Sequence, residues 1–279
     1  MPSTQPIFTV SLFPKLDQKL LETLRSLSAA DWAKPTIATQ WTVKDIAGHL
    51  LDGNIRSLSM LRDEYFGAPS PDVESYQGLV SYLNDLNADW IKAMKRVSPK
   101  ILLELLETTG RQYCDFLQSL DPDAQATFSV FWAGEETSPN WFHIAREYTE
   151  KWHHQQQIRL AVGQETVLYQ PEFYLPHLQT SMRALPHHYQ KIKGEKGALI
   201  CFQITGPTEA RWYLQRLKNK WVLIEANAPS PTCTVVIPGD IAWRIFTKGI
   251  SQDEAQKRVA ISGKTALGEP IFDMLAVMA

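Results

Sequence analysis

One stretch near the middle of the chain, residues 138–163 (SPNWFHIAREYTEKWHHQQQIRLAVG), constrains the fold and the chemistry more than any other. It predicts one long helix, because Ser138 and Pro139 are typical of a helix start and Gly163 is typical of a helix end. Polar side chains recur at helical spacing along one stripe of this helix, namely His143, Glu147, Glu150 and His154. Neutral imidazole nitrogen and carboxylate oxygen are both good ligands for a divalent metal.

Glu150 and His154 are four residues apart, so both side chains are placed to reach one ion. A hydrogen bond at this spacing on a helix surface is an equally ordinary explanation. His153 projects about 100° away from His154 on an ideal helix, so these two imidazoles are not expected to bind the same ion. The glutamines at 155–157 are interpreted as solvated helix surface or, beside a cavity, as groups that position a substrate. A third ligand has to come from elsewhere in the chain.

Composition excludes several classes of protein. The 279 residues are enough for two domains, and 44% hydrophobic with 21% charged residues is typical of a soluble globular protein. The formal charge of −2 gives no basic surface for nucleic acid. No apolar run approaches the ~20 residues of a membrane span, and the first residues do not have the pattern of a secretory signal. With three isolated cysteines, Cys114, Cys201 and Cys233, these features predict a cytoplasmic protein with reduced thiols and no membrane partner.

The first part of the chain predicts an all-helical bundle. Apolar periodicity predicts helices over residues 14–27, from Thr42 onward, and over residues 79–97 and 99–120. Thr42 and Asp45 have the spacing of a capping box at the start of the second helix, which contains His49.

The pattern changes in the last third of the chain. Short β-branched and aromatic runs between turn signals predict strands over residues 198–205, 210–217, 220–226, 232–237 and 259–262. Helices are expected over residues 239–248, after Ser251, and from Thr265 onward. The chain is therefore expected to form a helical domain over residues 1–165, a helical connector over 166–195 and an α+β domain over 196–279.

Three segments resemble the maleylpyruvate isomerase family of mycothiol-dependent enzymes. They are GHL around His49, TEKWHHQQQIR around His154, and the tail IAWRIFTKGIS…VAISGKTALGEPIFDMLAVMA. The resemblance covers most of the chain in order. It implies a DinB-like four-helix bundle followed by a small sterol-carrier-type α+β domain with a mixed or antiparallel sheet. It also implies that His49, Glu150 and His154 bind a divalent metal, in the first place zinc and in the second nickel, and that a low-molecular-weight thiol such as mycothiol is a cofactor.

The expected function is activation of that thiol, either for transfer of its sulfur to a small-molecule electrophile or for cis–trans isomerisation. Glu147 is the candidate general base, or the group that orients a ligand imidazole. Two alternatives stay open: a hydrolase in which metal-bound hydroxide attacks directly, and a protein that only binds a metal or a small molecule. The C-terminal domain is expected either to present a cation such as Arg244 to an acidic substrate or to stabilise or dimerise the protein, so a homodimer stays open.

Overall fold

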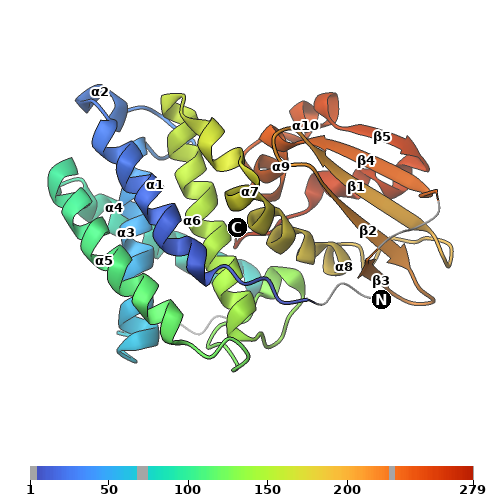
Figure 1. Cartoon of the computed structure of the whole chain (residues 1–279), viewed down its shortest axis with the longest axis horizontal. Helices are drawn as coiled ribbons and strands as arrows, with labels where there is room; N and C mark the ends of the chain where they lie inside the picture. The colour runs from blue at the N-terminus through green and yellow to red at the C-terminus, as the bar shows by residue number, and fades with distance from the viewer. Residues whose placement is uncertain (1–4, 68–74, 226–229, 279) are drawn as a thin grey trace. The chain divides into compact units, whose positions relative to one another are not determined.

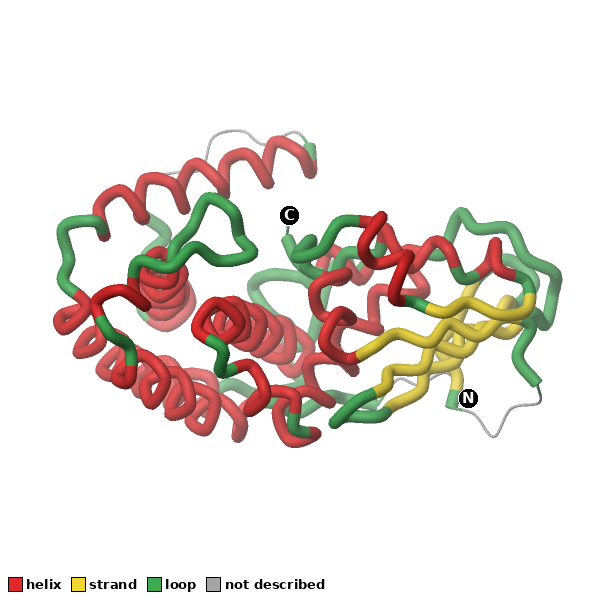
Figure 2. Tube along the Cα trace, turned by 90° about the horizontal axis from the view of Figure 1, so that it is seen from above, coloured by secondary structure: helices red, strands yellow, loops and turns green. Residues whose placement is uncertain are grey.

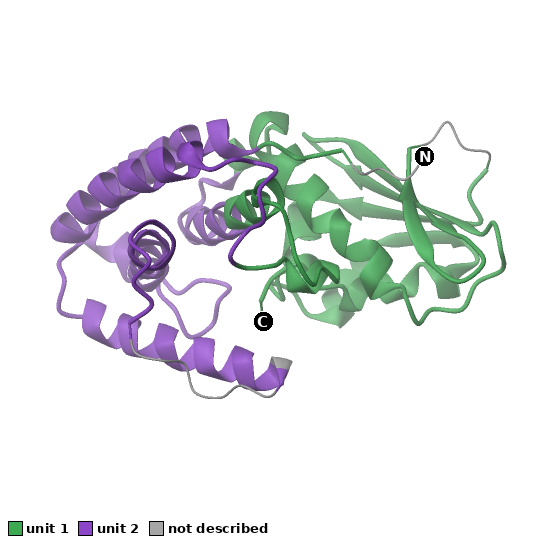
Figure 3. Cartoon of the chain, turned by 90° about the horizontal axis from the view of Figure 1, so that it is seen from below, with its two compact units in different colours: residues 1–8, 128–149, 166–279 green, residues 9–127, 150–165 purple. Residues whose placement is uncertain are grey.

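The computed structural model describes residues 5–67, 75–225 and 230–278, and the chain divides into two compact units. We call residues 9–127 and 150–165 the helical unit, and residues 1–8, 128–149 and 166–279 the sheet unit (Figure 3). The predicted fold class, a helical region followed by a smaller α+β region with a mixed sheet, is confirmed. The two units alternate along the sequence, because residues 128–149 group with the C-terminal part. The division into domains at 1–165, 166–195 and 196–279 stays a prediction about which segments fold independently.

The helical unit is built from long helices that pack on one another. In chain order its elements are η1 (Val10–Leu12), α1 (Phe13–Ser26), α2 (Ala29–Trp32), α3 (Val43–Ser57), η2 (Leu58–Arg62), α4 (Tyr76–Met94), α5 (Pro99–Ser119) and the second half of α6 (Asn140–Val162) (Figure 1). Helix α3 packs against α4 and α5, and α5 also packs against α1. The core between them is apolar and contains Leu20, Leu24, Trp32, Val43, Ile46, Ala47, Leu50, Leu51, Leu102, Leu106 and Ile158. The predicted helices are therefore confirmed, and their apolar stripes face this core.

The start of α3 is fixed by the predicted capping box. The Thr42 backbone N–H donates to Asp45 Oδ2 at 3.0 Å, and the Asp45 backbone N–H donates to Thr42 Oγ1 at 3.3 Å. Lys95 Nζ, just after α4, lies 2.6 Å from the other oxygen of Asp45. His49 lies one turn further along α3, so the same bonds fix the position from which its side chain projects.

Helix α6 differs in two ways from its prediction. It begins at Asn140 rather than at Pro139, and the Ser138 hydroxyl accepts a hydrogen bond from the Val130 backbone N–H at 2.9 Å. It ends as predicted before Gly163, which has a φ of +72°. The polar side chains at 155–157 are buried, so the expectation that they form solvated surface is wrong.

The sheet unit contains one five-stranded sheet among the described residues, drawn in yellow in Figure 2. Its strand order is β3-β2-β1-β4-β5. Its strands are β1 (Leu199–Thr205), β2 (Ala210–Arg216), β3 (Trp221–Ile224), β4 (Cys233–Pro238) and β5 (Ala260–Gly263). Strands β1 and β4 are parallel and the other neighbours are antiparallel. All five strand predictions are confirmed, although residue 226, the expected end of the third, lies outside the described residues. Strand β1 is central and buried on both faces over its first half, which explains its unbroken apolar run.

Short helices complete the sheet unit, and the first residue of one of them, η4, still belongs to the helical unit. They are η3 (Phe131–Ala133), η4 (Glu165–Tyr169), α7 (Pro171–Ser181), η5 (Met182–Ala184), α8 (Leu185–His188), α9 (Gly239–Phe246), α10 (Gln252–Arg258), η6 (Thr265–Leu267) and η7 (Glu269–Asp273). The helix expected from Thr265 is wrong, because the segment forms two 3₁₀ turns separated by Gly268. A Cβ at Gly268 would lie 2.7 Å from Ile261 Cγ2 and 2.8 Å from Val235 Cγ2. A residue larger than glycine would therefore not fit at this position unless the neighbouring side chains moved.

Candidate metal centre

His49 projects from the middle of α3, where the helix is held closely against α4. The Trp90 indole N–H donates to the Gly48 carbonyl at 2.8 Å, and a Cβ at Gly48 would already contact Met94 at 3.4 Å. Nδ1 of His49 is buried and has no hydrogen-bond partner among the residues that the structure describes. Burial, and then the proximity of His154 and Arg56, hold the pKa of His49 well below its usual value. The imidazole is therefore neutral, which is the form that binds a metal.

Helix α6 supplies three further side chains in the helical unit. His154 Nε2 lies 3.6 Å from Glu150 Oε2, and His153 Nδ1 lies 3.9 Å from the same oxygen. One ligand atom from each of the three residues lies within 4.8 Å of the other two. His154 Nδ1 lies 3.0 Å from Gln157 Oε1, which orients the ring. Burial, and then His153, lower the pKa of His154 well below its usual value, although the Gln157 hydrogen bond acts in the opposite direction.

The predicted ligands from α3 and α6 lie side by side. The His49 and His154 ring centroids are 4.6 Å apart, with the rings at 72° to each other. Trp41 lies beside both, with its ring 4.9 Å from that of His49 and 6.2 Å from that of His154. His49 does not belong to the group of Glu150, His153 and His154, whose ligand atoms lie within 4.8 Å of one another. His153 does belong to it, although the sequence did not favour this residue.

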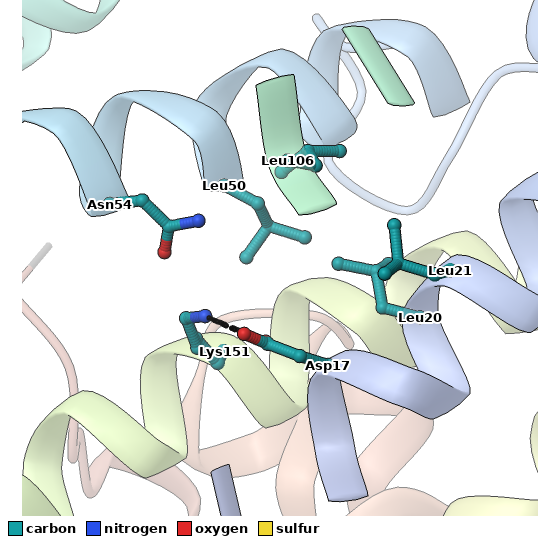
Figure 4. A pocket seen from close by; sticks show the side chains of 7 residues that line it. All are labelled: Asp17, Leu20, Leu21, Leu50, Asn54, Leu106 and Lys151. Carbon is teal, nitrogen blue, oxygen red and sulfur yellow. Dashed lines mark hydrogen bonds and ion pairs between the residues drawn. The ribbon is translucent and has the colours of Figure 1, made fainter. Parts of the chain in front are cut away.

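The next positions of α6 hold the helix against α1. Lys151 Nζ lies 2.7 Å from Asp17 Oδ1 (Figure 4), and the Gln155 side-chain amide donates to the Leu16 carbonyl at 2.8 Å. One turn later Arg159 Nη2 donates to the Lys19 carbonyl at 2.7 Å. The three residues of α6 are spaced four apart and form one stripe. Because this stripe is bonded to α1, α6 is fixed in rotation with Glu150 and His154 on the adjacent stripe.

Sequence reasoning missed this supporting stripe. Lys151, Gln155 and Arg159 are all buried although their side chains are polar. The only signal in the sequence is their four-residue spacing, which is equally typical of a solvated helix face. Burial separates the two interpretations, and it depends on packing against α1.

Glu147 and His143 belong to the part of α6 in the sheet unit. Glu147 Oε1 lies 2.6 Å from Arg146 Nη2, so the carboxylate has a guanidinium as its direct partner. Arg146 Nη2 also lies 3.2 Å from His143 Nδ1. Burial lowers the pKa of His143 to about 4, and the nearby Glu147 opposes this only in part. The structure therefore pairs Glu147 with Arg146 and does not place it among the grouped residues at positions 150, 153 and 154.

The donor set suits a divalent metal of intermediate softness. The neutral imidazoles and the carboxylate are ligands for zinc, nickel or cobalt rather than for calcium or magnesium. The buried, unpartnered Nδ1 of His49 is also the kind of polar atom that a missing ligand satisfies. The residues present therefore fit the metal that the sequence resemblance implied.

The family model and the solved structures that match this chain carry the name of the same enzyme. Residues 13–159 match the family model described as the mycothiol maleylpyruvate isomerase N-terminal domain. A crystal structure of the mycothiol-dependent maleylpyruvate isomerase aligns with a TM-score of 0.53 at 13% identity, covering 91% of both chains. A histidine-to-alanine mutant of the mycothiol-dependent maleylpyruvate isomerase aligns with a TM-score of 0.50 at 10% identity, also covering 91% of both chains. No curated protein sequence matches the chain. Because the family model spans more than half of its length, the chain belongs to the mycothiol maleylpyruvate isomerase N-terminal domain family.

Proposed function

We propose that this protein is a divalent-metal-dependent enzyme that activates a low-molecular-weight thiol for S-transfer or cis–trans isomerisation. The observation that carries the proposal is the contact of the His49 ring of α3 with the His154 ring of α6, whose Nε2 lies 3.6 Å from Glu150 Oε2, in a chain of this family. We assign these three residues as the metal ligands. Zinc is our first choice of metal and nickel the second.

In the folded protein the proposed ligand residues already have the protonation state and the orientation that metal binding requires. When bound, the metal supplies Lewis acidity that keeps a thiol deprotonated and nucleophilic near neutral pH. His49 and His154 are neutral in the folded protein, so no proton has to leave an imidazole when the metal binds. Gln157 holds the His154 ring through Nδ1, which leaves Nε2 directed toward Glu150.

The thiol cofactor is inferred from the family and from the names of the two solved neighbours. A thiolate adds to one carbon of an activated cis double bond, the resulting single bond rotates, and expulsion of the same thiolate restores the double bond in trans form. If the carbanion formed by the addition instead takes up a proton, the product keeps the sulfur as a thioether and the reaction is S-transfer. Mycothiol is the first thiol to test, with maleylpyruvate as the first electrophile.

Glu147 is our candidate for proton transfer or for orienting a ligand. Arg146 holds its carboxylate at 2.6 Å, and the side chain is 17% exposed, so it is both oriented and reachable by solvent. Its place one turn before Glu150 on α6 supports this role, which stays a prediction.

A reducing location is consistent with the thiol chemistry. Cys114, Cys201 and Cys233 are all buried free thiols, as is usual in a cytoplasm, where we place the protein. Within the described residues every helix is too short or too polar to cross a lipid bilayer.

Elemental analysis of the full chain, purified without added metal, tests the site. We expect about one zinc or nickel ion per chain in the parent and little in His49→Ala. The control is His187→Ala, because His187 is an exposed histidine of the sheet unit and its loss should leave the metal content unchanged. Absence of metal from the parent, even after zinc is added, would refute the site.

Turnover then separates the alternatives. The parent with mycothiol should isomerise maleylpyruvate or form a thioether, and omission of the thiol should abolish the reaction. Hydrolysis without a thiol would favour the hydrolase alternative. A metal-loaded protein without turnover would favour a binding role.

A further inference from the structure

We propose that His153 is a fourth protein ligand of the metal, binding through Nδ1 beside His49, Glu150 and His154. This inference rests on the proposed function, because it concerns the same metal. It adds a residue that neither the sequence pattern nor the family resemblance assigned.

The side chains of His153 and His154 converge despite their positions on the helix. Consecutive residues of an ideal α-helix point about 100° apart. The two rings nevertheless lie with centroids 4.0 Å apart at an interplanar angle of 38°. The two side chains can face the same point because each presents a different ring nitrogen to it. His153 presents Nδ1, which is close to its backbone, and His154 presents Nε2, at the far end of the ring.

The distances are near those of a coordinated set. Zinc–nitrogen bonds are about 2.1 Å long, so two donors in a tetrahedral centre lie about 3.4 Å apart. Glu150 Oε2 lies 3.6 Å from His154 Nε2 and 3.9 Å from His153 Nδ1. Small rotations of these side chains would therefore bring all three donors onto one ion.

Burial argues against a simple surface ion pair between His153 and Glu150. The His153 side chain is only 6% exposed, and it lies against the second imidazole rather than in solvent. Three imidazole rings thus lie next to one another, from His49 through His154 to His153, the first pair edge-on and the second tilted. One buried and two half-buried imidazoles beside one carboxylate are the donor set of a metal centre more than of a packed core.

A fourth protein ligand changes the expected metal chemistry. Four protein ligands fill a tetrahedral zinc site, which is the closed arrangement of structural centres. A thiol can then join only if the ion takes five or six ligands. Zinc centres can expand to five ligands, so the thiol would join as the fifth ligand and zinc stays our first choice of metal.

The test uses the full chain loaded with cobalt(II), whose visible absorption reports its ligands. The variants are His153→Ala and His153→Gln, with His154→Ala as the comparison at a ligand of the proposed function and His187→Ala as the control. Cobalt affinity is measured by chelator competition, and folding is checked by circular dichroism. We expect both His153 variants to bind cobalt at least tenfold more weakly and to shift its absorption, while His187→Ala matches the parent.

X-ray absorption spectroscopy of the cobalt-loaded parent protein counts the imidazole ligands without the use of any variant. We expect three imidazoles per cobalt ion. Two imidazoles per ion, together with parent-like affinity and absorption in His153→Gln, would overturn this inference alone, provided that His154→Ala loses the metal. Failure of the parent to bind cobalt or zinc would overturn both this inference and the proposed function.

Discussion

The buried ion pair between Asp17 and Lys151 gives the sharpest test of how the helical unit holds its candidate ligands. Lys151 Nζ lies 2.7 and 2.9 Å from the two carboxylate oxygens, and the Lys151 and Asp17 side chains are only 10% and 16% exposed. The ring centroids of Phe13 and Tyr113 lie 5.9 and 5.3 Å from Nζ. Figure 4 shows the two charged groups directed at each other beside leucine side chains. The pair therefore joins α1 to α6 in largely apolar surroundings.

The perturbation is Lys151→Met, which keeps the length of the side chain and removes the ammonium group. It leaves the Asp17 carboxylate buried without its cation. Removing one partner of a buried ion pair destabilises a protein by about 3–5 kcal/mol. Because both side chains are slightly exposed, we expect a loss near the lower end, about 3 kcal/mol. The double variant Asp17→Leu, Lys151→Met has no charge at these two positions. Its free energy of unfolding should lie within about 1 kcal/mol of that of the parent.

The assay is urea unfolding of the parent, both single variants and the double variant, followed by circular dichroism. The matched control is the ion pair of Arg25 and Glu107, which has the same 2.7 Å separation but side chains 53% and 48% exposed. Loss of that pair should change the free energy of unfolding by at most about 1 kcal/mol. A smaller loss of unfolding free energy in Lys151→Met than in the Arg25–Glu107 control would refute this account of the buried pair. A double variant whose loss of unfolding free energy equals the sum of the two single losses would refute it too. Metal affinity should also fall in Lys151→Met, because Glu150 is the preceding residue of α6.

Three further predictions follow from single positions. Gly110→Ala should destabilise the protein by about 1 kcal/mol in urea unfolding, although alanine favours helices, because the new Cβ would lie 2.7 Å from Asp17 Oδ2; a more stable variant would contradict this. Glu147→Gln should keep its metal in elemental analysis but lose turnover, whereas loss of the metal would make Glu147 a ligand. Burial lowers the pKa of His143 to about 4, so the folded state binds fewer protons than the unfolded chain between pH 6.5 and 4. The free energy of unfolding should therefore fall as the pH is lowered through this range, and His143→Gln should lessen that fall by about 3 kcal/mol; an unchanged pH profile would show that His143 is not responsible.

Local signals in the sequence were sufficient wherever neighbouring residues determine the structure. The capping box at Thr42 and the glycine at 163 mark helix ends through hydrogen bonds and dihedral angles of the residues themselves. The strands were predicted to within two residues because their β-branched runs are bounded by turn residues. The tail after Thr265 was mispredicted because the expected continuous helix did not take Pro270 into account, which has no backbone N–H to donate within a helix.

The sequence by itself determined the candidate chemistry of α6, because four-residue spacing places Glu150 and His154 on one stripe of any helix. The family resemblance, rather than any spacing, named His49. Only the tertiary structure decided that the rings of His49 and His154 lie 4.6 Å apart and that His153 joins the group. It also decided that Lys151, Gln155 and Arg159 are buried against α1 rather than solvated. The physical reason is that helical periodicity fixes the angle between side chains of one helix, whereas rotamers, burial and the approach of a second helix depend on packing between distant segments.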